Sequence, residues 1–238
     1  MSVLTFCERA LDKAGFVRMA LRVRAANWIE AETRLLPLLV DRERVAIDVG
    51  AADGFYSWHL KRLARDVIAF EPNPRSAASL RKMVPRLDVR ELALSNTKGS
   101  TNLRVPISGR VAASGWGTIH VDNDFSEISP DALESFMVQT ARLDDLELMN
   151  VGFIKIDVEG HEKEVLEGAY GLLARDRPAL LVETSGRVRG NDPGAVCKIL
   201  QGLGYATLHL RDKINLATID EVPPQQSAIN LIALPRCR

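Results

Sequence analysis

The stretch IDVGAADGFYS, residues 47–57, decides the fold because it joins a short apolar strand to a helix through a turn that contains glycine. Gly50 and Gly54 let the backbone approach a ligand closely at the carboxyl end of the strand, where open parallel sheets bind their ligands. Glu71 ends the next apolar run, 21 residues beyond Gly50. A carboxylate at that place can accept hydrogen bonds from ribose hydroxyls, so the two features predict a site for an adenosine-containing cofactor.

Apolar strand-like runs alternate with helical patterns from residue 45 onward, which predicts a mostly parallel sheet with helices on both faces. Helices are expected over residues 75–84, 161–174 and 193–204; the second has an apolar stripe, and the third ends at Gly202 or Gly204. The seven expected strands cover residues 44–50, 66–71, 88–94, 152–158, 179–184, 205–210 and 228–234.

Two regions depart from this alternation. Residues 1–40 carry helical patterns and are expected to form an N-terminal helical cap on a domain of residues 41–238, with Pro37 closing a helix over 28–36. Residues 95–140 are rich in Gly, Ser, Asn and Pro, and are expected to be irregular. Long irregular segments are usually functional or disordered, so this region is either a substrate loop region or a mobile surface loop.

Composition limits the function classes. The chain has 238 residues, of which 46% are hydrophobic, which suits one domain with a small elaboration. Lys and Arg total 31, as do Asp and Glu, so no overall field would attract nucleic acid or an anionic membrane. The three cysteines are far apart, which argues against a disulfide framework and a zinc site and favours the cytoplasm. Charges near the N-terminus argue against a signal peptide or a transmembrane segment.

Charge at the first turn indicates which nucleoside cofactor is bound. A dinucleotide site needs a G-x-G-x-x-G turn that presents amides to a pyrophosphate, and carboxylates would repel that anion. This turn lacks the spacing and carries Asp48 and Asp53. Such anionic groups suit the ammonium and sulfonium of S-adenosylmethionine. For Asp53, an N-cap on the following helix is an equally good interpretation.

Five blocks together resemble a known family, the FkbM-type S-adenosylmethionine-dependent methyltransferases, over roughly residues 40–235. The blocks are VAIDVGAADGFYS, AFEPNPRSAASLRKMV, LALSNTKGS, LDDL and FIKIDVEGHEKEVLEGA, and they occur in the family's order. The resemblance implies a class I methyltransferase (Rossmann-like) sheet of seven strands, the last antiparallel. It also implies O-methylation of a hydroxyl on a sugar, glycan or secondary metabolite.

Carried over position by position, the resemblance assigns parts of the cofactor site. The first turn would surround the methionine part, Glu71 would bind the ribose, Asn73 would support the Glu71 turn, and the region of Ala93 and Leu94 would lie beside the adenine. The predicted cofactor-binding residues are Asp48, Gly50, Ala51, Asp53, Gly54, Glu71, Asn73, Ala93 and Leu94.

The catalytic candidates lie in FIKIDVEGHEKE, residues 153–164, which the resemblance places at the substrate edge of the cleft. A hydroxyl acceptor needs a base within hydrogen-bond reach, and Asp157, Glu159 and His161 are the candidates. In an extended strand end these three would share a face, although Gly160 is expected to turn the chain before His161. Glu162 and Glu164 are interpreted as structural, because carboxylates in a first helical turn interact favourably with the helix dipole.

Several alternatives stay open. Clustered oxygens in this stretch could hold a divalent metal, which is not predicted but is not excluded by spacing. His161 could instead be a neighbour of a helix cap, and His120, on an expected lid with Arg110 and Trp116, could replace it as the base. The N-terminal segment could be a substrate cap, a homodimer face or a membrane-surface helix.

The function also has alternatives from other classes. One is a nicotinamide-dependent oxidoreductase on a similar sheet, and another is a cofactor-binding partner protein without turnover. The expected partner is a small-molecule or glycan acceptor and no nucleic acid.

Overall fold

The computed structural model describes residues 31–108, 111–112, 117–119, 133–184, 193–211, 215–218 and 229–236. Residues 1–30 of the expected cap lie outside the described residues, as do the three lid residues Arg110, Trp116 and His120. The described end of the cap consists of η1 (Ala31–Leu35) and α2 (Leu36–Leu39). Pro37 lies in the first turn of α2, so the expectation that it ends a helix is wrong. A proline is tolerated there because first-turn N–H groups have no partner within the helix.

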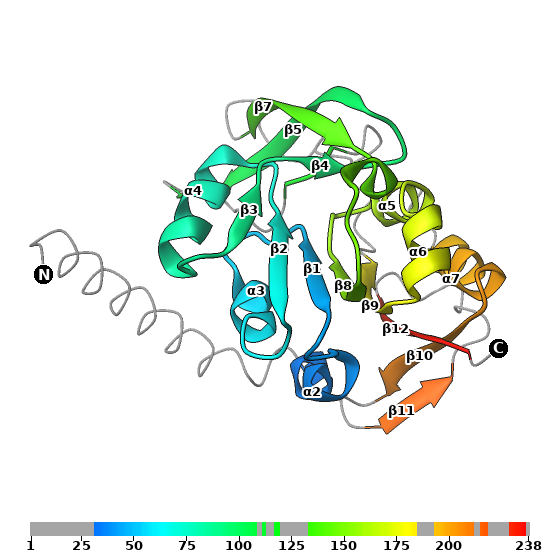
Figure 1. Cartoon of the computed structure of the whole chain (residues 1–238). Helices are drawn as coiled ribbons and strands as arrows, with labels where there is room; N and C mark the ends of the chain where they lie inside the picture. Colours follow the sequence, from blue (N-terminus) through cyan, green and yellow to red (C-terminus); the bar gives the residue numbers. More distant parts are fainter. Residues whose placement is uncertain are drawn as a thin grey trace, which may run out of the picture.

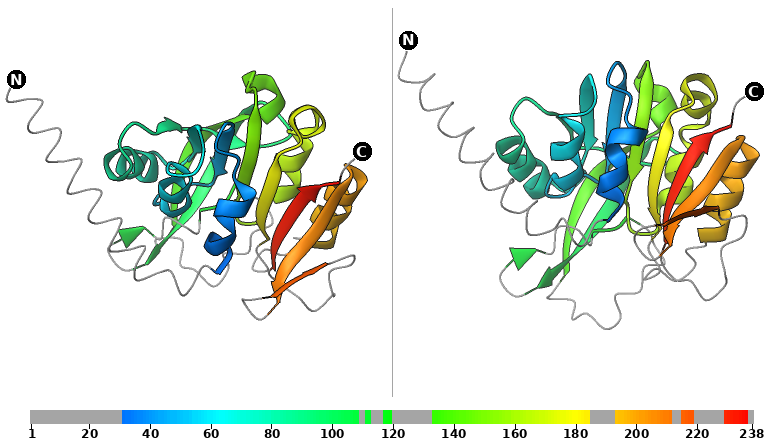
Figure 2. Two further views of the ribbon diagram at one scale, coloured as in Figure 1. Left: turned by 60° about the horizontal axis from the view of Figure 1, so that its bottom comes forward. Right: turned by 90° about the horizontal axis from the view of Figure 1, so that it is seen from below.

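The central sheet contains eight strands among the described residues, in the order β11-β10-β12-β9-β8-β1-β2-β3 (Figure 1). The pairs from β3 across to β9 are parallel, and β12 is antiparallel to both β9 and β10, as expected (Figure 2). β11 is an additional antiparallel edge strand. The bounds are β1 (Val45–Val49), β2 (Asp66–Phe70), β3 (Asp88–Arg90), β8 (Val151–Ile156), β9 (Ala179–Thr184), β10 (Tyr205–Arg211), β11 (Asn215–Thr218) and β12 (Ile229–Pro235).

β1 and β8 are neighbouring strands in the interior of the sheet, and every residue of both is buried. Strands covered on both faces read as nearly continuous apolar runs, which is what the sequence shows. Two charged residues interrupt the runs, Asp48 in β1 and Lys155 in β8, and they are register partners. Chain order reverses at this pair, since β2 continues on one side of β1 and β8 lies on the other. Open α/β sheets bind ligands at such a reversal, beyond the carboxyl ends of the strands.

Helices cover both faces of the sheet (Figure 1). α2, α3 (Phe55–Leu60) and α4 (Pro74–Met83) pack against one face. The other face is covered by α5 (Glu162–Glu167), α6 (Tyr170–Asp176) and α7 (Pro193–Gly202). A mostly parallel sheet with helices on both faces is the α/β fold class that was expected.

The single helix expected over 161–174 is in fact two helices, α5 and α6. The break lies at Gly168, whose carbonyl oxygen accepts a hydrogen bond from the Asp144 N–H at 3.0 Å. A Cβ at Gly168 would lie 2.0 Å from the carbonyl oxygen of Ser95, so only glycine permits this close approach. Neighbouring chain segments that no local pattern reveals therefore interrupt the helix.

The region 95–140 is not irregular throughout, so that expectation is wrong for its two ends. β5 (Gly99–Ser108) and β7 (Leu133–Ala141) pair antiparallel, and with β4 (Ala93–Leu94) and β6 (Val111–Ala112) they form a second, four-stranded sheet. Leu103, Val105 and Val138 belong to its small core. The expected strand 88–94 is divided, because β3 pairs with β2 whereas β4 pairs with β7.

None of the helices within the described ranges combines the length and apolar character that crossing a membrane would require.

Candidate active site

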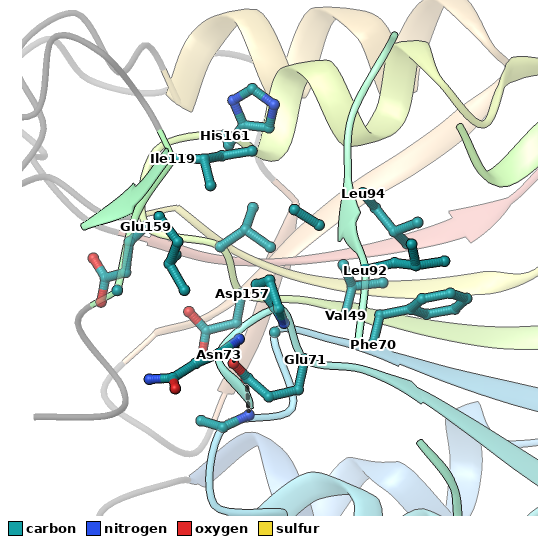
Figure 3. A pocket seen from close by; sticks show the side chains of 17 residues that line it. Val49, Phe70, Glu71, Asn73, Leu92, Leu94, Ile119, Asp157, Glu159 and His161 are labelled. Carbon is teal, nitrogen blue, oxygen red and sulfur yellow. Dashed lines mark hydrogen bonds between the residues drawn. The ribbon is translucent and has the colours of Figure 1, made fainter. Parts of the chain in front are cut away.

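A pocket lies at the carboxyl edge of the central sheet, where β2 and β8 flank β1 (Figure 3). Its lining comes from the ends of these three strands, from β4, from Leu103 of the second sheet, and from Gly117 and Ile119. Thr118 ties the second sheet to the pocket, because it forms a bridge with Arg104 of β5 and its Oγ1 donates to the carbonyl oxygen of Glu159 at 2.9 Å. The region expected to be a substrate loop therefore contributes one wall.

Glu71 is the most firmly held polar group of the pocket. It is 5% exposed, and its carboxylate accepts hydrogen bonds from the N–H of Ala52 at 2.7 Å and of Asn73 at 2.8 Å. Burial raises the pKa of Glu71 to about 7, and the two amide donors oppose that rise. Each carboxylate oxygen can accept a further hydrogen bond, so Glu71 can bind two adjacent hydroxyls such as those of a ribose.

Asn73 organises the turn after β2. Its N–H donates a hydrogen bond to the Glu71 carboxylate. Its side-chain oxygen caps α4 by accepting a hydrogen bond from the Arg75 N–H at 3.0 Å. Pro74 occupies the first turn of α4 and fixes φ there. The turn is therefore rigid before any ligand arrives.

The glycine turn after β1 is fixed between β2 and β8. The N–H groups of Gly50 and Ala51 donate to the Phe70 carbonyl, and the N–H of Asp157 donates to the Val49 carbonyl. Gly50 has φ +78°, and a Cβ on it would lie 1.8 Å from the carbonyl oxygen of Asp157. Only glycine allows this contact between the turn and the end of β8.

The structure separates the residues expected at this turn. Of the five residues predicted here, Gly50 lines the pocket, whereas Asp48, Ala51, Asp53 and Gly54 do not. Ala52, which was not predicted, also lines the pocket. Gly54 (φ 84°) is the N-cap of α3. The Asp53 carboxylate accepts a hydrogen bond from the Phe55 N–H at 3.3 Å, but the N-cap is Gly54, so the alternative interpretation of Asp53 as the N-cap is wrong by one residue.

Asp48 lies behind the turn. It is 2% exposed, and its carboxylate accepts a hydrogen bond from Ser57 Oγ at 2.6 Å. Burial raises the pKa of Asp48 to about 6, while the hydrogen bond from Ser57 and the charge of Lys155 oppose the rise. Asp48 therefore contributes negative charge beneath the turn without forming the pocket surface.

One wall of the pocket is apolar. Figure 3 shows Val49, Phe70, Leu92 and Leu94 on one side, away from the carboxylates. Ala93 and Leu94 are buried in β4 and line the pocket. A flat, weakly polar ring suits this wall, while hydroxyls and cationic groups suit the carboxylates.

Asp157, Glu159 and His161 all line the pocket, but for a different reason from the one expected. β8 ends at Ile156, and Glu159 and Gly160 have φ angles of 49° and 97°. The expectation that the three residues share one face of an extended strand is therefore wrong, because the chain already turns at Glu159. Figure 3 shows Asp157 close to Glu71 and Asn73, whereas His161 lies at the far end beside Ile119.

His161 and Glu162 stabilise the turn in different ways. The Nε2 of His161 lies 2.9 Å from Ser95 Oγ, which joins the turn to the segment after β4. Glu162 is fully buried, accepts from the Gly160 N–H at 2.9 Å, and has its pKa raised to about 7 by burial. Its role is structural, as expected, but it acts from the interior and not as a surface charge on a helix dipole.

The sequence interpretation missed Lys155 and Glu183. The Lys155 side chain is 1% exposed, and its Nζ lies 3.3 Å from Asp157 Oδ2 and 3.3 Å from Glu183 Oε2. The signal that could have found them was a lysine inside the apolar run FIKI, since a lone charge in a buried strand needs a partner. Glu183 near the end of the neighbouring strand was such a partner.

Within the described ranges, no three His, Cys, Asp or Glu side chains form a group able to hold a metal ion. The carboxylates around the pocket can bind an organic cation that also carries hydroxyls.

Comparison with known proteins gives the family. The Methyltransferase FkbM domain matches residues 48–207, more than half of the chain. A methyltransferase FkbM from Methylobacillus flagellatus KT shares the fold, with a TM-score of 0.50 and 16% identity over 82% of this chain and 44% of that one. This chain thus spans less than half the length of that protein. A TehB-like SAM-dependent methyltransferase from Corynebacterium glutamicum has a TM-score of 0.50 and 11% identity over 94% of this chain and 100% of that one.

No curated protein matched the chain. The family match covers the first turn, Glu71 and the stretch from Asp157 to Glu162, and the class I methyltransferase fold accounts for the position of the pocket. We conclude that the chain belongs to the FkbM methyltransferase family.

Proposed function

We propose that this methyltransferase transfers a methyl group to a hydroxyl of a sugar, glycan or secondary metabolite, and that it does so in the cytoplasm. The observation that carries the proposal is the presence of two carboxylates, Asp157 and Glu159, in the same pocket as Glu71. A hydroxyl is a poor nucleophile that gains from a carboxylate able to accept its proton.

The residues that line the pocket fit S-adenosylmethionine as the cofactor. Glu71 would accept hydrogen bonds from the ribose hydroxyls, Ala93 and Leu94 would contact the adenine, and the turn at Gly50 would leave room for the methionine part. S-adenosylmethionine, when bound, supplies a methyl group on a cationic sulfur, and transfer to an acceptor oxygen leaves S-adenosylhomocysteine and a proton.

Asp157 is the first choice for the group that takes that proton, because it lies beside Glu71 at the polar end of the pocket (Figure 3). Glu159 is the second choice, since its position depends on the turn at Gly160. His161 lies at the end of the pocket that we assign to the adenine, so its catalytic role is the weakest of the three. Most of the acceleration would come from holding the acceptor oxygen in line with the methyl group.

The acceptor can be found by incubating the protein with a methyl-labelled donor and extracts of glycans and small metabolites, followed by identification of the labelled product. A labelled methyl ether of a hydroxyl compound supports the proposal. A labelled nitrogen, carbon or nucleic acid product would refute the O-methylation of small hydroxyl compounds while leaving the family unchanged.

Family membership removes the nicotinamide-dependent oxidoreductase as an alternative. The non-catalytic partner protein remains a distinct outcome. In that case calorimetry would detect S-adenosylhomocysteine binding, while no acceptor would cause release of S-adenosylhomocysteine from the methyl donor. Under our proposal, Glu71→Ala abolishes cofactor binding, whereas Asp157→Ala reduces turnover more than binding.

A further inference from the structure

Lys155 is a buried cation that the proposed reaction does not yet explain. It lies in β8, an interior strand of the sheet, and only 1% of its side chain is exposed. Removing an ammonium from water is costly, and replacing a buried ion pair by apolar residues is often neutral or stabilising. An apolar residue would therefore suit this strand position at least as well for stability alone.

The strand geometry places Lys155 directly beneath the polar end of the pocket. Its register partner in β1 is Asp48, and the side chain of Tyr56 in α3 lies against it, with Nζ 4.7 Å from the ring centre. Alternate residues of a strand share a face, so Lys155 and Asp157 point to the same side of the sheet.

Glu183 completes the arrangement from β9. The last register pair of β8 and β9 is Ile156 with Val182, so Asp157 and Glu183 follow at the same level on parallel strands. Both carboxylates contact the same Nζ at 3.3 Å, so the two contacting oxygens lie no more than twice that distance apart. Lys155 thus joins two carboxylates at the carboxyl edge of the sheet.

Exposure distinguishes the carboxylates from the lysine. The side chains of Asp157 and Glu183 are 35% and 38% exposed, so each has surface that faces away from the ammonium. Asp157 lines the pocket, whereas Lys155 does not. The contact with Asp157 therefore links the lysine to the pocket.

We propose that Lys155 is a positioning residue for methyl transfer, which holds the Asp157 carboxylate toward the reacting methyl group, with Glu183 as the second anchor of the ammonium. The backbone of Asp157 is already fixed by its contact with Gly50 and by the hydrogen bond that its N–H donates to the Val49 carbonyl oxygen. Lys155 supplies the remaining constraint, on the side chain. This inference rests on the proposed function, in which Asp157 lies beside the methyl group.

The test compares two ligands that differ by one methyl group and one positive charge, S-adenosylmethionine and S-adenosylhomocysteine. Calorimetry gives Kd for both, and their ratio measures how strongly the pocket prefers the cation. A carboxylate held near the sulfonium favours the cation, so Asp157→Asn should reduce the preference by about tenfold. In a Lys155→Gln background, Asp157→Asn should reduce the preference for the cation by less than about threefold, because the carboxylate of Asp157 is no longer held by the ammonium.

Lys155→Arg is the matched control, because it keeps the charge in the strand and should preserve most of the effect of Asp157→Asn. A merely structural role would alter both affinities together and leave their ratio unchanged. An equal effect of Asp157→Asn in the native and the Lys155→Gln backgrounds would overturn the role of Lys155 alone. No effect of Asp157→Asn in the native background would overturn the placement of Asp157, and the inference with it.

Two further measurements keep the test decisive if Lys155→Gln does not fold. Lys155→Met, which suits a fully buried strand position, can replace Lys155→Gln as the background in which Asp157→Asn is measured. In addition, the ammonium signal of Lys155 in ¹⁵N-lysine NMR spectra should shift in both Asp157→Asn and Glu183→Gln. A signal that neither change moves would overturn the inference.

Discussion

The two sides of the pocket hold their carboxylates differently. On the β2 side, Glu71 is 5% exposed and is held by two main-chain N–H groups. On the β8 side, the Asp157 side chain is 35% exposed, and its carboxylate contacts the side-chain ammonium of Lys155. Main-chain donors are fixed by the fold itself, whereas a side-chain partner can be removed by one substitution. The proposed cofactor side is therefore held by the main chain, and the proposed reacting side depends on a charged side-chain partner.

The largest expected effect tests whether the two sides meet through Gly50. Gly50→Ala adds a Cβ that would lie 1.8 Å from the Asp157 carbonyl oxygen, at a φ of +78° that residues with side chains rarely adopt. We expect a loss of about 4 kcal/mol or more of unfolding free energy and no measurable cofactor binding. Denaturant titration and calorimetry measure both.

Gly202→Ala is the matched control, because nothing lies within 4 Å of a Cβ there and the residue ends α7. We expect a change of less than about 1 kcal/mol. A native-like Gly50→Ala protein would show that the turn and β8 can separate.

The second effect concerns the reacting side. Asp157→Asn keeps the shape of the side chain but removes the proton acceptor, so turnover should fall by about 10²- to 10⁴-fold, while S-adenosylhomocysteine affinity changes by less than about threefold. Steady-state kinetics with the acceptor from the labelled-donor screen, paired with calorimetry, measures this difference. If Glu159→Gln gives the larger loss of turnover, the base is Glu159.

The third effect concerns the cofactor side. Glu71→Gln places an amide where both carboxylate oxygens now accept main-chain hydrogen bonds, so one N–H donor faces another. We expect cofactor affinity to fall by about 10- to 100-fold, since each buried donor left unpaired costs about 1–3 kcal/mol. Calorimetry with S-adenosylhomocysteine checks this. Unchanged affinity would mean that Glu71 does not hold the ribose.

The last expected effect is a pH dependence of the free energy of unfolding of the cofactor-free protein. Burial raises the pKa of Glu71 and Glu162 from 4.5 to about 7, and that of Asp48 from 3.8 to about 6. At a pH between the ordinary and the raised pKa of each group, the native state binds more protons than the unfolded chain. The free energy of unfolding should therefore fall as pH rises from about 5 to 7. Thermal unfolding at several pH values measures the slope.

Glu162→Gln should flatten that slope, because the amide keeps an acceptor for the Gly160 N–H and cannot ionise. Relative to the native protein, the variant should gain stability at pH 8, by on the order of 2 kcal/mol, and not at pH 5. A slope as steep as that of the native protein would show that Glu162 is not the source.

Local sequence patterns determined much of this protein. The apolar runs of β1 and β8, the glycines of the first turn, and the charged stretch after Ile156 predicted the sheet, the cofactor edge and the three pocket residues Asp157, Glu159 and His161. These features depend on neighbours in the chain, where side-chain period and backbone freedom act directly.

Tertiary structure decided the rest, because it brings together residues that are distant in the chain. β5 and β7 pair across more than twenty intervening residues, so the Gly- and Ser-rich composition of the region did not reveal this antiparallel pair. The break between α5 and α6 follows from the approach of Ser95 to Gly168. The partnership of Lys155 with Glu183 depends on the register of two strands joined by two helices, a long-range contact that no local period can specify.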